Sequence, residues 1–111
     1  MAYDEVLADR VRDLLVGEPG LTERKMFGGL SFLINGHMSV SVSGKGGLML
    51  RCDPEETDRL LHKPFASIFE MRDRMMDGWL RVDAAGLKTR AQLGRWTAIG
   101  VDYARSLPPK R

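Results

Sequence analysis

The sequence predicts an α+β domain: an antiparallel sheet of about five strands with helices in its N-terminal, middle and C-terminal parts. Three observations predict this class. An apolar pattern with helical spacing opens the chain, two apolar runs flank an Asn-Gly pair, and a capping signature precedes the last helical pattern. The length of 111 residues, with 43% hydrophobic and 29% charged residues, is typical of one globular domain, so we expect residues 1–111 to form a single domain.

The first predicted helix covers residues 4–16, and the first predicted strand covers residues 23–27. Glycine and proline in the segment 17–20 end the helix. The strand ends at the pair Gly28-Gly29, which permits a sharp bend or a bulge before the next strand. The apolar side of the helix is expected to comprise Val6, Leu7, Val11, Leu14 and Leu15.

Residues 30–34 and 38–42 are predicted to form a hairpin around Asn35-Gly36, because this pair accepts the positive φ angles of a type I′ turn. In the second strand the apolar residues alternate with serines, so we expect one buried face and one polar face. The flexible run 44–47 then leads into a strand over 48–52. The residues expected to face the helices are Met38, Val40, Val42, Leu48, Leu50 and Cys52.

The middle helix is predicted to begin at Asp53-Pro54-Glu55-Glu56, which combines an N-cap acceptor, a proline and early carboxylates, and to run to about His62. Within residues 65–78 the pattern allows a strand over 69–71, and 79–82 is predicted to be a further strand. The last helix is predicted to begin with Thr89 as its cap and Gln92 in the capping-box position. Its apolar stripe is expected to comprise Leu93, Trp96, Gly100, Tyr103 and Leu107.

Residues with catalytic chemistry are few. Cys52 alternates with leucines and is expected to be a small core residue, His37 to be an edge residue, and His62 to end the middle helix. The run Gly44-Lys45-Gly46-Gly47 leads into a strand and lacks the earlier glycine of a phosphate loop. We therefore expect no catalytic residue, no metal and no cofactor. An enzyme or a small-molecule-binding protein is the alternative. This alternative requires that Cys52 or His37 lie in a pocket beside a positioned partner side chain.

Two surfaces are candidates for binding macromolecules. The first is the sheet face opposite the expected helices, where Trp, Met and Arg are typical of protein interfaces, although a helix or loop covering this face is an equal alternative. The second consists of basic segments for nucleic acid, for which ordinary solvated charge is the competing interpretation, since the net charge is only +2. The candidate interface residues are Met49, Arg51, Trp79 and Arg81; the candidate nucleic-acid contacts are Arg24, Lys25, Arg72 and Arg74.

The run RKMFGG, followed by a short apolar strand and the turn Asn35-Gly36, resembles the TfoX N-terminal domain family over nearly the whole chain. The resemblance implies an α+β fold similar to secretion chaperones. In full-length TfoX/Sxy proteins, which carry a second, C-terminal domain, it implies regulation of natural competence together with the cAMP receptor protein. The family motif residues, expected to be structural, are Arg24, Lys25, Met26, Phe27, Gly28, Gly29, Asn35 and Gly36.

The leading hypothesis is a stand-alone, non-enzymatic regulatory or protein-interaction module that forms a homodimer or binds another protein. Nucleic-acid binding is the alternative. The lone Cys52 excludes an intrachain disulfide, no apolar stretch reaches the length of about 20 residues that spans a membrane, and the N-terminus lacks an export signal. We therefore expect a cytoplasmic bacterial protein without membrane contact.

Overall fold

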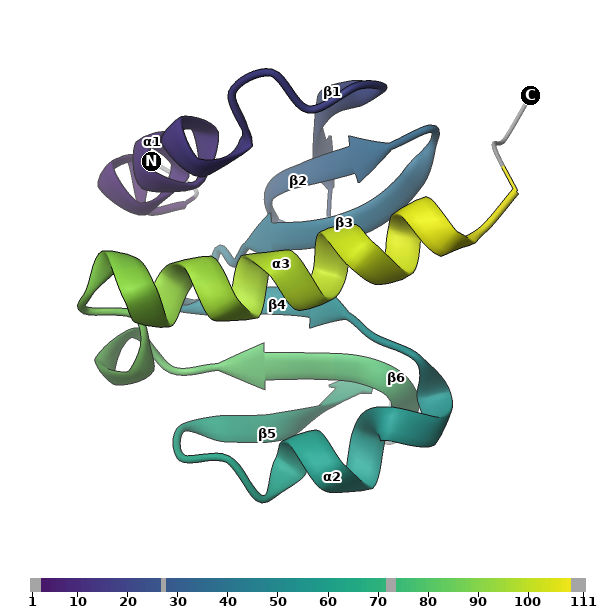
Figure 1. The fold of residues 1–111 in the computed structure, drawn as a ribbon. Coiled ribbons are helices and arrows are strands. Elements are labelled where there is room, and N and C mark those ends of the chain that lie inside the picture. Colours follow the sequence, from purple (N-terminus) through teal and green to yellow (C-terminus); the bar gives the residue numbers. More distant parts are fainter. Residues whose placement is uncertain (1–2, 27, 72–73, 109–111) are drawn as a thin grey trace.

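A computed structural model describes residues 3–26, 28–71 and 74–108. Within them three α-helices cover one face of a six-stranded antiparallel sheet, whose strand order is β1-β2-β3-β4-β6-β5 (Figure 1). Two short 3-10 turns, η1 (Pro54–Glu56) and η2 (Ala84–Gly86), precede α2 and α3. The main elements are α1 (Glu5–Leu15), β1 (Leu21–Met26), β2 (Gly29–Ile34), β3 (His37–Val42), β4 (Leu48–Arg51), α2 (Thr57–Leu61), β5 (Ala66–Met71), β6 (Arg74–Val82) and α3 (Arg90–Ser106).

The α+β class and the antiparallel sheet are thus confirmed, with one strand more than expected. The additional strand is β5, where the sequence allowed only the short piece 69–71. It pairs with β6 from Ala66 to Met71, because the two segments form a hairpin. Among the described helices none is long and apolar enough to cross a membrane.

The first helix begins at Glu5, next to the start that the sequence predicts. The Asp4 carboxylate accepts a hydrogen bond from the Leu7 amide at 3.1 Å, which satisfies one of the first amides of α1. Val6 was expected on the apolar side of this helix, but its side chain is 71% exposed. The buried stripe of α1 begins one residue later. That stripe comprises Leu7, Ala8, Val11 and Leu15.

The predicted hairpin is confirmed, since Asn35 and Gly36 have φ angles of 52° and 86° between β2 and β3. A register shift follows within this pair: Phe32 lies opposite Val40 and Leu33 opposite Met38, which leaves Ser39 as an extra residue. Met38 was expected beside Val40 under the helices. It instead pairs with Leu33, and both side chains are buried outside the core cluster.

The polar face of the central strands is also buried. Ser31 donates to Ser41 at 3.0 Å, and Ser41 donates to the Leu30 carbonyl oxygen at 3.2 Å. Ser39 donates to the carbonyl oxygen of Phe32 at 2.8 Å. These bonds satisfy the hydroxyl groups, so the serines occupy a dry position without the penalty of an unpaired polar group.

The glycine pair of the family motif lies where β1 turns into β2. Gly28 has a φ of 75°, a conformation that glycine adopts without strain. A Cβ atom on Gly29 would lie only 2.0 Å from the Val42 carbonyl oxygen of β3. The expected sharp bend is therefore present, and the second glycine is required by a close approach of two strands.

The last helix carries the predicted capping box, in which Thr89 and Gln92 exchange hydrogen bonds at 3.0 Å. Leu93, Trp96 and Gly100 are buried as expected, whereas Tyr103 and Leu107 are half-buried, because the buried stripe passes instead through Val101 and Ala104. A Cβ atom on Gly100 would lie 2.3 Å from the Ser39 carbonyl oxygen, so α3 contacts the backbone of β3 directly.

Both ends of α3 are attached to the N-terminal part of the chain. Arg10 of α1 donates to the Leu87 carbonyl oxygen at 2.7 Å, just before the helix begins. Near its other end, Arg105 pairs with Glu18 and also donates to the Pro19 carbonyl oxygen. Arg12 joins α1 to β1 through Glu23, at 2.8 Å.

The middle of the chain is fixed by polar contacts at each turn. The Asp53 carboxylate accepts from the Glu55 amide at 3.0 Å and caps η1, which continues into α2 as predicted. The Thr57 hydroxyl accepts from the Gly78 amide at 2.8 Å and thereby holds the start of α2 against β6. The glycine-rich run after Ser43 connects β3 to β4, as expected for a hairpin connection.

Candidate functional site

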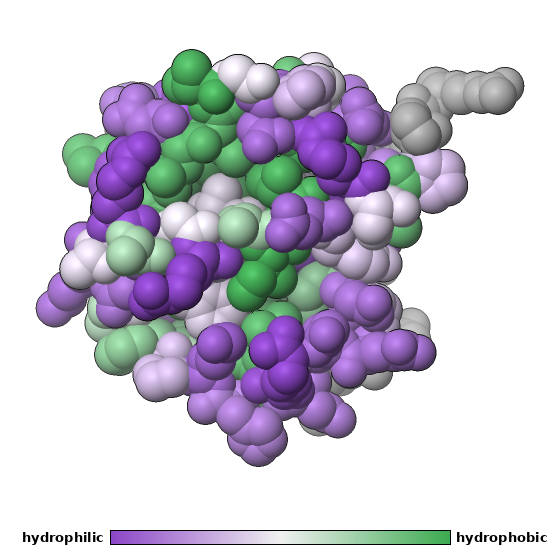
Figure 2. Space-filling view, in the orientation of Figure 1, coloured by the Kyte–Doolittle hydropathy of each residue, from purple (hydrophilic) through white to green (hydrophobic). Residues whose placement is uncertain are grey.

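A groove of about 530 Å³ lies between α2 and α3 on the helix-covered side of the molecule. In the space-filling view, an apolar patch over the middle of α3 continues toward α2, with hydrophilic side chains on both sides (Figure 2). Its volume falls within the range of about 300–1,000 Å³ that is typical of ligand sites. The lining residues are Arg59, Leu60, Lys63, Pro64, Phe65, Gly86, Gln92, Arg95, Trp96, Ala98 and Ile99.

Helical spacing places one wall of the groove. Gln92, Arg95, Trp96 and Ile99 are three or four residues apart, so they share the side of α3 that faces α2. On α2 and the loop after it, Leu60 and Pro64 supply apolar surface. Leu60 and Trp96 are almost fully buried, which makes the floor of the groove apolar.

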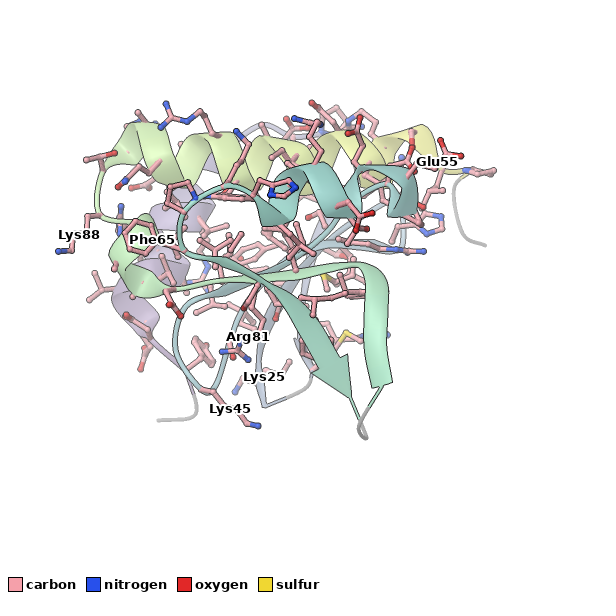
Figure 3. The ribbon with its side chains drawn as sticks, turned by 90° about the horizontal axis from the view of Figure 1, so that it is seen from below. Lys25, Lys45, Glu55, Phe65, Arg81 and Lys88 are labelled. Atoms are coloured by element: carbon pink, nitrogen blue, oxygen red, sulfur yellow. The ribbon has the colours of Figure 1, made fainter. Side chains whose placement is uncertain are left out.

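Phe65 forms one end of the groove and has an unusual backbone conformation. Its φ angle is 70°, a left-handed conformation that a bulky residue rarely adopts. Its carbonyl oxygen accepts from the Asp83 amide at 3.0 Å, and its ring packs on Gly86, where an added Cβ would lie 2.7 Å from the Phe65 Cβ. Figure 3 shows the ring close to η2. The side chain is nevertheless 48% exposed.

The rim of the groove is positively charged. Arg59, Lys63 and Arg95 line it, and its described lining contains no carboxylate. Glu56 lies outside the lining and pairs with Arg59 at 2.5 Å, so part of that charge is already compensated. For Lys63 and Arg95 no acidic partner occurs within the described part of the chain. The groove therefore combines an apolar floor with uncompensated positive charge at its edge.

The four candidate interface residues form two cross-strand pairs, Met49 with Arg81 and Arg51 with Trp79. Met49 is only 4% exposed and so contributes little accessible surface. The Arg51 guanidinium lies 5.4 Å from the ring centroids of Trp79 and of Tyr103, and in this way it connects the end of β4 to α3. Arg81 donates to the Gly46 carbonyl oxygen at 3.1 Å.

The structure describes only some of the candidate nucleic-acid contacts. Arg24 and Lys25 are exposed on the edge strand β1 and point to opposite sides, because they pair with Ser31 and Leu30. Arg72 lies outside the described residues, as does the side chain of Arg74. Of the family motif, Phe27 also lies outside them. In Figure 3 Lys45 and Arg81 lie on the side of the sheet away from α3.

The residues with catalytic chemistry lie apart from the groove. Cys52 is 1% exposed in the core, and desolvation raises the pKa of its thiol, although a hydrogen bond with Thr57 opposes this effect. His37 lies with its Nε2 atom 2.6 Å from the Pro108 carbonyl oxygen, the distance of a hydrogen bond that the ring donates. His62 caps the end of α2. Over residues 3–26, 28–71 and 74–108, no group of His, Cys, Asp and Glu side chains has an arrangement that suits a metal ion.

The sequence did not predict the groove. Its two walls, 59–65 and 92–99, are separated by the β5–β6 hairpin, and nothing local indicates that they meet. Two signals were available: the basic residues Arg59, on α2, and Lys63, just beyond its end, are four residues apart, and Arg95 directly precedes Trp96 on α3. Each signal is local to one segment of the chain, and only the fold brings the two segments together.

The fold and the groove define a class: an α+β domain in which three helices cover one face of an antiparallel sheet and leave a cationic groove between two of them. The family model of the TfoX N-terminal domain matches residues 13–104 of the sequence, and the chain belongs to this family. No protein with a curated description matches the chain.

Proposed function

We propose that the protein is a non-enzymatic regulatory or protein-interaction module that forms a homodimer through the helix-free face of its sheet. The observation that carries the proposal is the one-sided arrangement: α1, α2 and α3 all pack on one face, and no described helix covers the other (Figure 1). We propose a regulatory role because the chain resembles the N-terminal domain of TfoX competence regulators.

The helix-free face carries residue types that are typical of interface centres. Leu80 points into the core, so its neighbours Trp79 and Arg81 point to the opposite face. Trp79 packs on Arg51, whose guanidinium also lies over the ring of Tyr103 on α3, and both Trp79 and Arg51 are only half-buried. Tryptophan and arginine dominate the binding energy of many protein interfaces, and a face of this kind can pair with its own copy about a two-fold axis.

Sedimentation equilibrium at micromolar concentrations tests the homodimer. We expect a dimer for the unchanged chain and a dissociation constant at least tenfold weaker for Trp79→Ala. Phe65→Ala is the matched control, because it removes an exposed aromatic ring from the helix-covered side. A chain that stays monomeric, or a dimer that Trp79→Ala leaves unchanged, contradicts the proposal.

Nucleic-acid binding is the second candidate, because Lys45 and Arg81 lie on the side of the sheet away from α3 (Figure 3) and Lys25 is exposed on the edge strand β1. It predicts an affinity for duplex DNA or RNA that falls steeply as salt is added. Lys25→Gln combined with Lys45→Gln should weaken binding and flatten the salt dependence. The absence of any complex in a low-salt mobility shift would remove this candidate.

A further inference from the structure

We propose that the groove between α2 and α3 binds an organic anion with an apolar body, a carboxylate that carries an aliphatic chain. This site is separate from the helix-free sheet face and does not depend on the dimer. The probe that represents this chemistry is decanoate.

The positive charge of the rim favours a ligand with negative charge. Lys63 and Arg95 come from two different elements and line the same groove, and the described lining brings no carboxylate between them. An anion placed there gains charge-assisted hydrogen bonds and relieves the repulsion between the two cations. The same two side chains would repel a cationic ligand.

The floor of the groove selects the rest of the ligand. Pro64, Phe65 and Ile99 present the accessible apolar surface, above the buried side chains of Leu60 and Trp96. A simple inorganic anion would leave this surface in contact with water. A chain of methylene groups removes it from water, and each buried methylene is worth about a fourfold gain in affinity.

Phe65 is the second observation that points to a ligand. Its left-handed backbone is unfavourable for a bulky side chain, and such outliers concentrate at binding sites. The conformation sets a half-exposed ring against Gly86 at the end of the groove, where the ring gains little burial without an occupant. An apolar chain in the groove would cover the exposed part of this ring.

Trp96 allows the site to be followed directly. The chain has two tryptophans, so Trp79→Phe leaves Trp96, in the groove, as the sole reporter. Decanoate, kept below its micelle concentration, is titrated into this variant while Trp96 emission and the heat of binding are measured. Both signals should saturate with one dissociation constant, whereas decyltrimethylammonium, with the same chain and the opposite charge, should produce neither.

Matched charge reversals localise the anion. Lys63→Glu should weaken decanoate binding about tenfold or more, and so should Arg95→Glu. Lys45→Glu makes the same change in net charge at an exposed loop outside the groove lining, and its affinity should stay within about twofold. All three residues are exposed, so circular dichroism and thermal melts should show that the variants fold.

Chain length tests the apolar part: affinity should rise about fourfold per methylene from hexanoate through octanoate to decanoate. The proposal is wrong if no saturable binding occurs, if the ammonium probe binds as well as decanoate, or if Lys45→Glu weakens binding as much as Lys63→Glu. Binding that is independent of chain length would reduce the site to a surface anion contact and also overturn it. None of these outcomes bears on the dimer, which sedimentation tests separately.

Discussion

The two faces of the central sheet reach the same degree of burial by different means. On the helix-covered face Phe32, Val40 and Leu50 are fully buried in an apolar cluster under three helices. On the helix-free face Ser31 and Ser41 are as deeply buried, yet they are held by hydrogen bonds. The helix-covered face is stabilised by apolar packing, whereas the helix-free face combines these hydrogen bonds with the buried side chains of Leu33, Met38 and Met49.

The largest expected effect comes from neighbouring residues of β2 that point to opposite faces. Phe32→Ala should lower the free energy of unfolding by about 3–5 kcal/mol, because it opens a cavity under the helices. Ser31→Ala should cost only about 1 kcal/mol, since Ser41 keeps its bond to the Leu30 carbonyl oxygen. Urea unfolding measures both values. Equal costs would show that the two faces are stabilised in the same way.

A pair of glycines on α3 tests how closely the covered face is packed. Gly100→Ala should destabilise the protein by about 1–3 kcal/mol, because its Cβ would lie 2.3 Å from the Ser39 carbonyl oxygen. Gly94→Ala should instead stabilise it by about 0.5–1 kcal/mol, since the nearest atom, Leu14 Cδ2, is 3.9 Å away and alanine favours the helix. Thermal melts at one pH give the two shifts. Shifts of the same sign would contradict the close contact between α3 and β3.

The smallest effect concerns the ion pair that joins α1 to the edge of the sheet. The hydrogen bond from Arg12 lowers the pKa of Glu23 below its usual value of 4.5. A carboxylate with a lowered pKa stabilises the fold at pH values above its unfolded pKa, and this contribution is lost as the pH falls through the folded pKa. Both side chains are more than a third exposed, so screening limits the contribution to about 0.2–1 kcal/mol.

Glu23→Gln should therefore cost this small amount at pH 7, and the cost should decrease as the pH falls through the folded pKa of Glu23. Guanidinium would screen the pair, so urea unfolding at several pH values is the appropriate measurement. Asp102→Asn provides a control, because Asp102 is an exposed carboxylate for which the described residues offer no ion-pair partner. A difference between wild type and Glu23→Gln that is independent of pH would exclude the ion pair as its cause.

Features governed by neighbouring residues were predictable from the sequence. Asn35-Gly36 and Thr89 with Gln92 determine a turn and a cap through contacts within a few residues, and both are confirmed. The glycine pair of the family motif also bends the chain as expected. These signals succeed because the hydrogen bonds or dihedral angles that they require are local.

Features that depend on distant segments were missed. The bulge at Ser39 moves Met38 out of the helix-covered core, and strict alternation contains no sign of it. The burial of Ser41 depends on the surrounding strands, and the exposure of Val6 on how α1 packs. The groove between α2 and α3 needs the whole β5–β6 hairpin to bring its walls together. In each case the deciding contact joins segments whose proximity the local pattern does not determine.

The attachment of α3 at both ends has a consequence for synthesis of the chain. α3 is the last of the described elements to leave the ribosome, yet it provides part of the cover for β2, β3 and β4 and holds contacts up to 87 residues away in sequence. Until it emerges, the apolar side of the nascent sheet lacks part of its cover, and the strands remain prone to wrong pairing. Folding is thus expected to occur late and all at once, after translation of the final helix.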